Sequence, residues 1–212
     1  MNHCLVIGQH NVGKTLLSFR LAQLCGMKSV FVLRELDSDP HLQQVIGVNE
    51  AIHSIIDGTN PRIVDVQTIG IGMSQEMGQP AILYDSVGLS EKFDDGLYRR
   101  RQMARTLDLF VSCDLVLHVV DASTLVTEKL SLIDTQIKSF ARARRVPYVL
   151  VANKADLLSM RRQHRSHLTL RQDKPLFVSA KMDQGLTPLK HVLERTNMVN
   201  YSYPFWMRGV LN

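Results

Sequence analysis

Residues 8–15 of the chain read Gly8-Gln9-His10-Asn11-Val12-Gly13-Lys14-Thr15. The run follows an apolar stretch from His3 to Ile7 and precedes leucines at helical spacing. Its two glycines let the backbone curl, so that successive N–H groups point inward at phosphate oxygens. The lysine reaches the outer phosphates, and the threonine hydroxyl is a hard oxygen ligand for Mg²⁺. The run therefore predicts a nucleoside triphosphate site between a strand and a helix.

A second phosphate-directed segment reads Asp85-Ser86-Val87-Gly88 and directly follows the predicted strand Ala81–Tyr84. A carboxylate at a strand end can hold Mg²⁺, usually through water, and a glycine three residues later lets a backbone N–H face the γ-phosphate. The pattern is common in turns, so its weight comes from its position after a strand. We expect Asp85 to help hold Mg²⁺ and Gly88 to sense the γ-phosphate.

A third segment, Asn153-Lys154-Ala155-Asp156, predicts which base is bound. Guanine presents an N1–H and an amino group on one edge, and the carboxylate of Asp156 accepts both, whereas adenine offers no such pair. Losing a hydrogen bond to a charged group costs about 1.5–3 kcal/mol, which is enough for clear discrimination. After a further short strand, Ser179-Ala180-Lys181 offers a backbone N–H to the guanine carbonyl.

The chain between and after these segments alternates between predicted strands and helices, with no linker or internal repeat. Such alternation predicts a single three-layer α/β domain with a mostly parallel sheet. The expected elements are strands at Leu115–Val120, Tyr148–Ala152 and Leu176–Val178, and helices at Leu97–Val111, at Leu130–Phe140 and from Thr187-Pro188 onward.

The part of the chain before Asp85 is less regular. Arg62–Ser74 alternates like a strand whose phase slips near Gln67 and Thr68, which suggests a bulge. Together with the strand that ends at Tyr84 it predicts an antiparallel hairpin. Val30–Leu33 fits either an extra strand or the end of a helix.

Residues 34–58 form an unusual insert. Leu42, Val45, Ile46, Ile52 and Ile56 recur at roughly helical intervals, so we expect a helix there. Two interpretations stay open: a helix that packs on the sheet edge, or a segment that is covered and released as the nucleotide changes.

The four segments, in this order and each at a strand end, resemble those of the translation-factor-class P-loop GTPases. The chain is most similar to the Era, TrmE and Der group over about Asn2–Arg195. The resemblance implies a three-layer P-loop NTPase fold whose mostly parallel, six-stranded sheet has one antiparallel edge strand. It also implies GTP and Mg²⁺ as ligands, hydrolysis to GDP and phosphate, and a nucleotide-dependent molecular switch.

The resemblance assigns catalytic roles to Lys14, Thr59 and Gly88 and Mg²⁺ ligation to Thr15, Thr59 and Asp85. Asn11 stands where the group coordinates K⁺ beside the phosphates, although a loop asparagine that stabilises its own turn is the alternative. The nucleotide-binding residues on this view are Gly8, Asn11, Val12, Gly13, Lys14, Thr15, Thr59, Asp85, Gly88, Asn153, Lys154, Asp156, Ser179, Ala180 and Lys181.

Two departures from the family pattern affect the mechanism. The switch threonine is expected just before the hairpin, where Thr59 stands, and Thr68 is its rival within the strand pattern. Leu89 follows Gly88 at a place where some GTPases carry a glutamine that orients water, so hydrolysis is expected to be slow and to need K⁺ or a partner. Two alternatives stay open: a module that holds nucleotide for assembly or scaffolding without turnover, and an ATPase of a related group, which Val30–Leu33 suggests.

Composition bounds the remaining possibilities. The 212 residues are 45% hydrophobic and 21% charged, typical of one globular domain, and no apolar run approaches the ~18 residues of a membrane span. Cys4, Cys25 and Cys113 lie in or beside apolar runs without CxxC spacing, which predicts reduced core thiols in a cytoplasmic protein. The net charge of +5 permits contact with RNA, ribosome or anionic lipid without requiring it.

Two surface features leave partners undecided. The arginines at 99–101, 105, 142, 144, 145, 161 and 162 fit a solvated helix surface, or an RNA or ribosome contact that the absence of interleaved aromatic residues makes less favoured. We take residues 1–197 as the GTPase domain and 198–212 as an aromatic tail packed on it. An effector protein that docks on the tail, or a nucleotide-dependent dimer, is the alternative.

Overall fold

The computed structural model describes residues 2–34, 42–59, 66–71, 81–90, 96–127, 130–158 and 174–195. The elements in chain order are β1 (Asn2–Gly8), α1 (Lys14–Leu24), β2 (Ser29–Arg34), β3 (Leu42–Gly47), α2 (Val48–Ile56), β4 (Gln67–Ile71), β5 (Ala81–Asp85), α3 (Leu97–Ser112), β6 (Leu115–Asp121), α4 (Ala122–Thr127), α5 (Leu132–Arg144), β7 (Tyr148–Asn153), the 3-10 helix η1 (Ala155–Leu157), β8 (Leu176–Phe177) and α7 (Thr187–Arg195).

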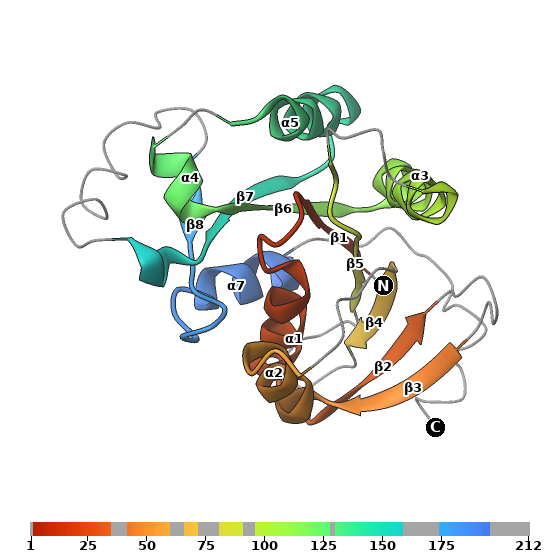
Figure 1. Cartoon of the computed structure of the whole chain (residues 1–212), viewed down its shortest axis with the longest axis vertical. Coiled ribbons are helices and arrows are strands. Elements are labelled where there is room, and N and C mark those ends of the chain that lie inside the picture. Colours follow the sequence, from red (N-terminus) through yellow and green to blue (C-terminus); the bar gives the residue numbers. More distant parts are fainter. Residues whose placement is uncertain are drawn as a thin grey trace.

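Eight strands form one sheet in the order β3-β2-β4-β5-β1-β6-β7-β8, with helices on both faces (Figure 1). Alternation along β1 explains the layers, because successive side chains of a strand point to opposite faces. Cys4 and Val6 join the core beneath α1, α2 and α7, whereas Leu5 and Ile7 join the core that includes Phe110 of α3. The three-layer α/β architecture predicted from the sequence is confirmed.

The sheet has eight strands rather than the six expected. Val30–Leu33 belongs to β2, which resolves the alternative between strand and helix end. The prediction of one helix over Leu42–Ile56 is wrong in its first half, because residues 42–47 form β3 and pair antiparallel with β2. Leu42, Val45 and Ile46 match a helical period by spacing alone. Val45 is exposed at this outer strand, so the apolar residues of β3 do not all lie on one buried face. The sequence therefore lacks the alternation of apolar and polar residues that marks a half-buried strand.

The predicted hairpin is present, because β4 pairs antiparallel with β5, whereas β1, β6, β7 and β8 run parallel. The predicted bulge at Gln67 and Thr68 is wrong, since both residues hold an unbroken register with β5 and with β2. Four of the five residues of β4 are buried, so the strand does not need strict alternation, and this explains the apparent phase slip. The connection between the two strands, residues 72–80, lies outside the described residues.

The helices α3, α5 and α7 begin within two residues of where the sequence predicts, whereas the short helix α4 was not predicted. Ser131 caps α5, its hydroxyl accepting the N–H of Asp134, and Arg145 ends that helix in the left-handed conformation. α7 begins at Thr187, as predicted. α2 packs against α1 and buries Val48, Ala51 and Ile52, so the second half of the insert is a helix with an apolar face.

The three cysteines are buried free thiols, as predicted. Burial raises the pKa of the Cys113 thiol to about 11, and it raises the pKa of Cys4 as well, so neither is a reactive thiolate near neutral pH. Among the described residues, no helix is both long enough and apolar enough to cross a membrane. The aromatic tail at 198–212 lies outside the described residues, and its packing stays a prediction.

Candidate functional site: a nucleotide cavity at the carboxyl ends of the strands

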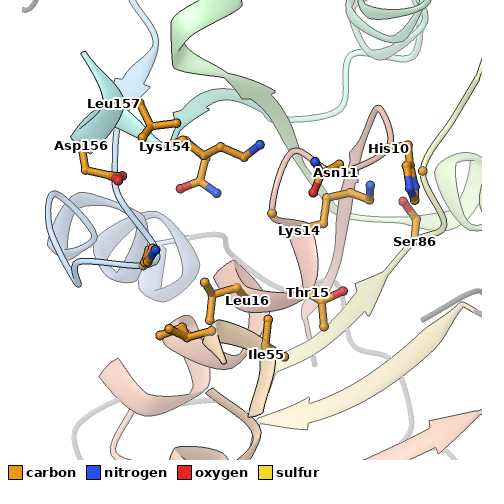
Figure 2. Close-up of a pocket in the computed structure, with 15 residues that line it drawn as sticks. His10, Asn11, Lys14, Thr15, Leu16, Ile55, Ser86, Lys154, Asp156 and Leu157 are labelled. Carbon is orange, nitrogen blue, oxygen red and sulfur yellow. The ribbon is translucent and has the colours of Figure 1, made fainter. Parts of the chain in front are cut away.

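A cavity of about 520 Å³ lies where the loops after β1, β5, β7 and β8 meet (Figure 2). Nine of the predicted nucleotide-binding residues line it: Asn11, Gly13, Lys14, Thr15, Gly88, Asn153, Lys154, Asp156 and Lys181. Figure 2 shows Lys14 and Thr15 at one end of the cavity and Asp156 at the other. The separation matches a ligand with phosphates at one end and a base at the other.

Lys14 begins α1 and is only 6% exposed. Its ammonium donates hydrogen bonds to the carbonyl oxygens of Gln9 at 2.7 Å and Gly8 at 3.3 Å, so the loop itself holds the amine in place. Burial lowers the pKa of Lys14 to about 8, and the Asp85 carboxylate opposes part of that shift. The amine is thus a buried cation that gains strongly from an anionic ligand.

Thr15 and Asp85, two of the predicted Mg²⁺ ligands, meet beside the phosphate loop. The Thr15 hydroxyl donates to Asp85 Oδ2 at 2.6 Å, and Asp85 is 1% exposed at the end of β5. A hydroxyl and a carboxylate are the hard oxygen donors that Mg²⁺ prefers, so this pair fits the ion that the motifs imply. Thr15 and Asp85 are 70 positions apart in the chain, and their motifs predicted both as ligands of the same Mg²⁺ ion.

The side chain of Asn153 connects the phosphate loop with the last motif. Its amide nitrogen donates to the Val12 carbonyl at 2.9 Å, and its amide oxygen accepts the Ala180 N–H at 3.0 Å. Gly13 must be glycine beside it, because a Cβ there would lie 2.4 Å from the Asn153 amide and the backbone φ is 89°. Since the Ala180 N–H is bonded to Asn153, its predicted contact with the guanine carbonyl stays a prediction.

Asp156 lines the cavity at the end opposite Lys14 and Thr15, where the base is predicted to bind. Its Oδ1 accepts the Ser179 hydroxyl at 2.6 Å, which leaves the carboxylate with further acceptor capacity. Lys154, at φ 63°, forms an ion pair with Asp121 at 3.0 Å. Ser179 and Ala180 do not line the cavity themselves but fix the residues that do.

Gly88 lies against the phosphate loop. A Cβ on Gly88 would be 2.5 Å from the His10 Cα, so only glycine permits this approach. The next N–H, of Leu89, donates to the Gly8 carbonyl at 3.1 Å, and the Leu89 side chain is 7% exposed within the core. The Leu89 side chain therefore packs into the core and presents no group that could orient a water molecule.

The two candidate switch threonines occupy different places. Thr59 follows α2, where its hydroxyl donates to the Ser54 carbonyl at 3.2 Å, and it does not line the cavity. Thr68 lies within β4, paired with Tyr84 and Leu33. The assignment of Thr59 to Mg²⁺ stays a prediction.

A buried polar network supports the phosphate loop from behind, and sequence reasoning missed it. The Gln9 amide donates to Asp134 Oδ2 at 2.7 Å, Asp134 Oδ1 lies 2.9 Å from His118 Nε2, and His118 Nδ1 lies 2.7 Å from the Tyr148 hydroxyl. Burial alone would raise the pKa of Asp134, but hydrogen bonds from His118, Ser131 and Gln9 lower it, so the carboxylate is ionised. A lone histidine in a strand pattern carried no signal for this network.

Sequence reasoning also missed the apolar wall of the cavity, which includes Leu16, Ile55 and Ile56. Figure 2 shows Ile55, from α2, beside Leu16 of α1. The apolar period of the insert predicted burial for Ile56, but not that it would face the nucleotide cavity.

The comparisons with known proteins agree with this geometry. A family model described as "50S ribosome-binding GTPase" matches residues 43–154, just over half of the chain. GTPase Der of Persephonella marina is 29% identical in an alignment of 182 positions, and the match covers 81% of this chain and 38% of Der. The chain thus spans little more than a third of the length of that relative.

Two solved structures share the fold. Aquifex aeolicus Era bound to GDP and aluminium fluoride has a TM-score of 0.59 at 18% identity, covering 95% of this chain and 58% of Era. Era in complex with MgGDPNP and a segment of 16S ribosomal RNA has a TM-score of 0.53 at 17% identity, covering 96% of this chain and 59% of that Era chain.

The chain belongs to this GTPase family and is a P-loop GTPase of the Era and Der group. The resemblance seen in the sequence is therefore confirmed. β2 does follow α1 directly, the feature that suggested an ATPase, but the family match and the β4–β5 hairpin before Asp85 go against that alternative.

The burial of Lys14 predicts a pH dependence of nucleotide binding. In the free protein the amine loses its proton as the pH rises through about 8, and bound phosphates restore it. Affinity for GDP should fall about fourfold between about pH 7 and pH 8.5, with uptake of most of one proton per GDP at the higher pH. Titration calorimetry in buffers of different ionisation enthalpy measures both. An affinity for GDP that does not change with pH, with no proton uptake, would contradict the assignment of Lys14 as the buried amine that binds the phosphates.

Proposed function

We propose that this protein binds GTP with Mg²⁺, hydrolyses it to GDP and phosphate, and acts as a nucleotide-dependent switch. One observation carries the proposal: Lys14 and Asp156 line the same cavity from opposite ends, and Asn153 ties the phosphate loop to the loop after β8. A guanine nucleotide satisfies both ends at once.

The chain's own residues have distinct parts in this reaction. Lys14 and the N–H groups of residues 8–15 neutralise the phosphate oxygens. Thr15 and Asp85, together with Thr59, would hold Mg²⁺, which supplies charge stabilisation at the β- and γ-phosphates. The N–H of Gly88 faces the γ-phosphate. Water attacks the γ-phosphorus, the bond to the bridging oxygen breaks, and GDP leaves with no covalent intermediate on the protein.

Unaided turnover is proposed to be slow. Leu89 is buried in the core and offers no polar group to a water molecule. Intrinsic rates on the order of 10⁻⁴ s⁻¹ are typical of GTPases that lack their activator. A cation or a partner would then have to supply the missing stabilisation.

Asn11 is the residue through which K⁺ would act. It lines the cavity with its backbone at φ 61°, and Figure 2 shows its side chain beside Lys14. A monovalent cation at this place would stabilise charge that develops at the β,γ-bridging oxygen. The left-handed backbone is also what an ordinary turn asparagine adopts, so the side chain itself has to be tested.

The variant Asn11→Gly separates these roles, because glycine keeps the left-handed backbone and removes only the amide. We expect GTP hydrolysis by the natural protein to be about tenfold faster in KCl than in NaCl, and the variant to lose that difference while still binding GDP. Phosphate release under single-turnover conditions measures both rates. Equal rates in the two salts for the natural protein would remove Asn11 from the mechanism.

The second candidate function is a module that holds guanine nucleotide for assembly or scaffolding, with little or no turnover. The insert at 34–58 and the aromatic tail at 198–212 favour it as features that could serve assembly, whereas the buried Leu89 is compatible with either function. Tight GTP binding without phosphate release in either salt, with or without candidate partners, would select this function over the first.

We also propose that α2 senses the nucleotide. Ile55 and Ile56 line the cavity from the last turn of α2, whereas Ala51 and Ile52 face the core. The helix therefore contacts both the ligand space and α1, and a bound nucleotide would change its packing. This favours the switch interpretation of the 34–58 insert over simple packing on the sheet edge.

Hydrogen–deuterium exchange tests this proposal. Amides of α2 should exchange at least about threefold more slowly with a non-hydrolysable GTP analogue than with GDP, because opening of the helix exposes its hydrogen bonds. Amides of residues 137–144 in α5, which lie beyond Asp134 and do not line the cavity, serve as the internal control. Identical exchange of α2 in the two states would leave the insert a structural element.

RNA or ribosome contact, an effector protein and a cytoplasmic location remain proposals for this chain. The family description names the 50S ribosome, and one Era structure holds ribosomal RNA. Arg100 and Arg101 on α3, with Arg142 and Arg145 at the end of α5, are exposed and would suit phosphate contacts. RNA binding that weakens steeply with salt would support such a surface, and no binding at low salt would exclude it.

A further inference from the structure

We infer that Arg20 of α1 is a positioning residue for guanine: it fixes the peptide between Ala180 and Lys181, and thereby the contact to the 6-carbonyl of the base. The inference rests on the proposed function, since it concerns how the same cavity reads its nucleotide. Arg20 Nε donates to the Ala180 carbonyl at 2.9 Å, and Nη2 donates to the Lys181 carbonyl at 3.4 Å. The two segments are 160 residues apart in the chain.

The loop after β8 needs such support. Among the described strands, β8 is two residues long and pairs only with β7, and beyond Val178 the loop is held to itself by the backbone pair between Ser179 and Gln184 rather than by the sheet. Asn153 holds the Ala180 N–H, and Ser179 is tied to Asp156. Arg20 is the partner of the Ala180 and Lys181 carbonyl oxygens, on the side of α1.

Because a peptide group is planar, the contact of Arg20 with the Ala180 carbonyl also sets the direction of the next N–H group. In a trans peptide the carbonyl of one residue and the N–H of the next point in opposite directions. Because Arg20 holds the Ala180 carbonyl toward α1, the Lys181 N–H in the same plane points away from α1. Lys181 lines the nucleotide cavity. The structure therefore assigns this N–H as a donor for the 6-carbonyl of guanine, with its direction set by Arg20.

The guanidinium shape matters more than its charge. Nη1 donates to the Gln23 side chain at 2.8 Å, which fixes the plane of the fork and leaves Nε and Nη2 for the loop. The ion pair with Asp183 is long, at 3.7 Å, and the Asp183 side chain is 49% exposed, so solvent screens it. The Arg20 side chain itself is 12% exposed. The carbonyl contacts are therefore the contribution that a variant would lose.

Binding of three diphosphates to the full chain, with Mg²⁺, tests the inference. GDP is compared with 6-thio-GDP, in which a weak acceptor replaces the carbonyl oxygen, and with IDP, which lacks the 2-amino group that Asp156 reads. In Arg20→Met the affinity for GDP should fall about tenfold, the loss typical of one hydrogen bond. The preference for GDP over 6-thio-GDP should shrink toward one. The preference for GDP over IDP should stay as in the natural protein.

Two further variants complete the design. Asp183→Asn removes only the ion pair and should leave all three affinities unchanged. Arg20→Lys keeps the charge without the fork, should behave like Arg20→Met, and serves as the test if the methionine variant does not fold. The inference is overturned if the preference for GDP over 6-thio-GDP survives in the Arg20 variants, or if both preferences fall together. A natural protein that binds none of the three nucleotides would instead defeat the proposed function.

Discussion

The carboxamide of Asn153 is the constraint on which the site depends. With one donor and one acceptor it joins the phosphate loop, through Val12, to the loop after β8, through Ala180. It is 2% exposed, so both hydrogen bonds are made away from water, where leaving either group unpaired costs about 1–3 kcal/mol. Gly13 is glycine because this amide occupies the place of its side chain.

This bridge makes base recognition and phosphate binding one structural unit. The Asp156 carboxylate follows Asn153 by three residues and is held by Ser179, next to the Ala180 N–H that Asn153 binds. On the other side, the phosphate loop, which includes Val12, accepts two hydrogen bonds from the Lys14 amine. The two ends of the cavity are therefore held in one hydrogen-bonded framework that Asn153 joins.

The sequence predicted the parts whose chemistry dictates residue type and spacing. Lys14, Thr15, Asp85 and Asp156 were identifiable because phosphate, Mg²⁺ and guanine each demand particular groups after particular strands. Contacts that depend on tertiary structure carried no such signal. Arg20 and Gln9 find their partners more than 100 residues away, and nothing in their neighbourhoods marks them.

The errors in the fold have a similar origin. Leu42, Val45 and Ile46 satisfy a helical period, but pairing with β2 decides that they form a strand, and that partner is invisible to local spacing. Gln67 broke the alternation of β4 because the interior of a sheet buries both faces. Local pattern predicted the strands β5 to β8 well, and it missed β3 at the outer edge of the sheet.

Competition between nucleotides tests the central claim most directly. A fluorescent GDP analogue bound to the protein with Mg²⁺ is titrated with GTP and, separately, with ATP. A cavity in which Asp156 reads the edge of guanine predicts displacement by GTP at concentrations at least about 100-fold lower than by ATP. Displacement by ATP at the same concentrations as GTP would contradict the account.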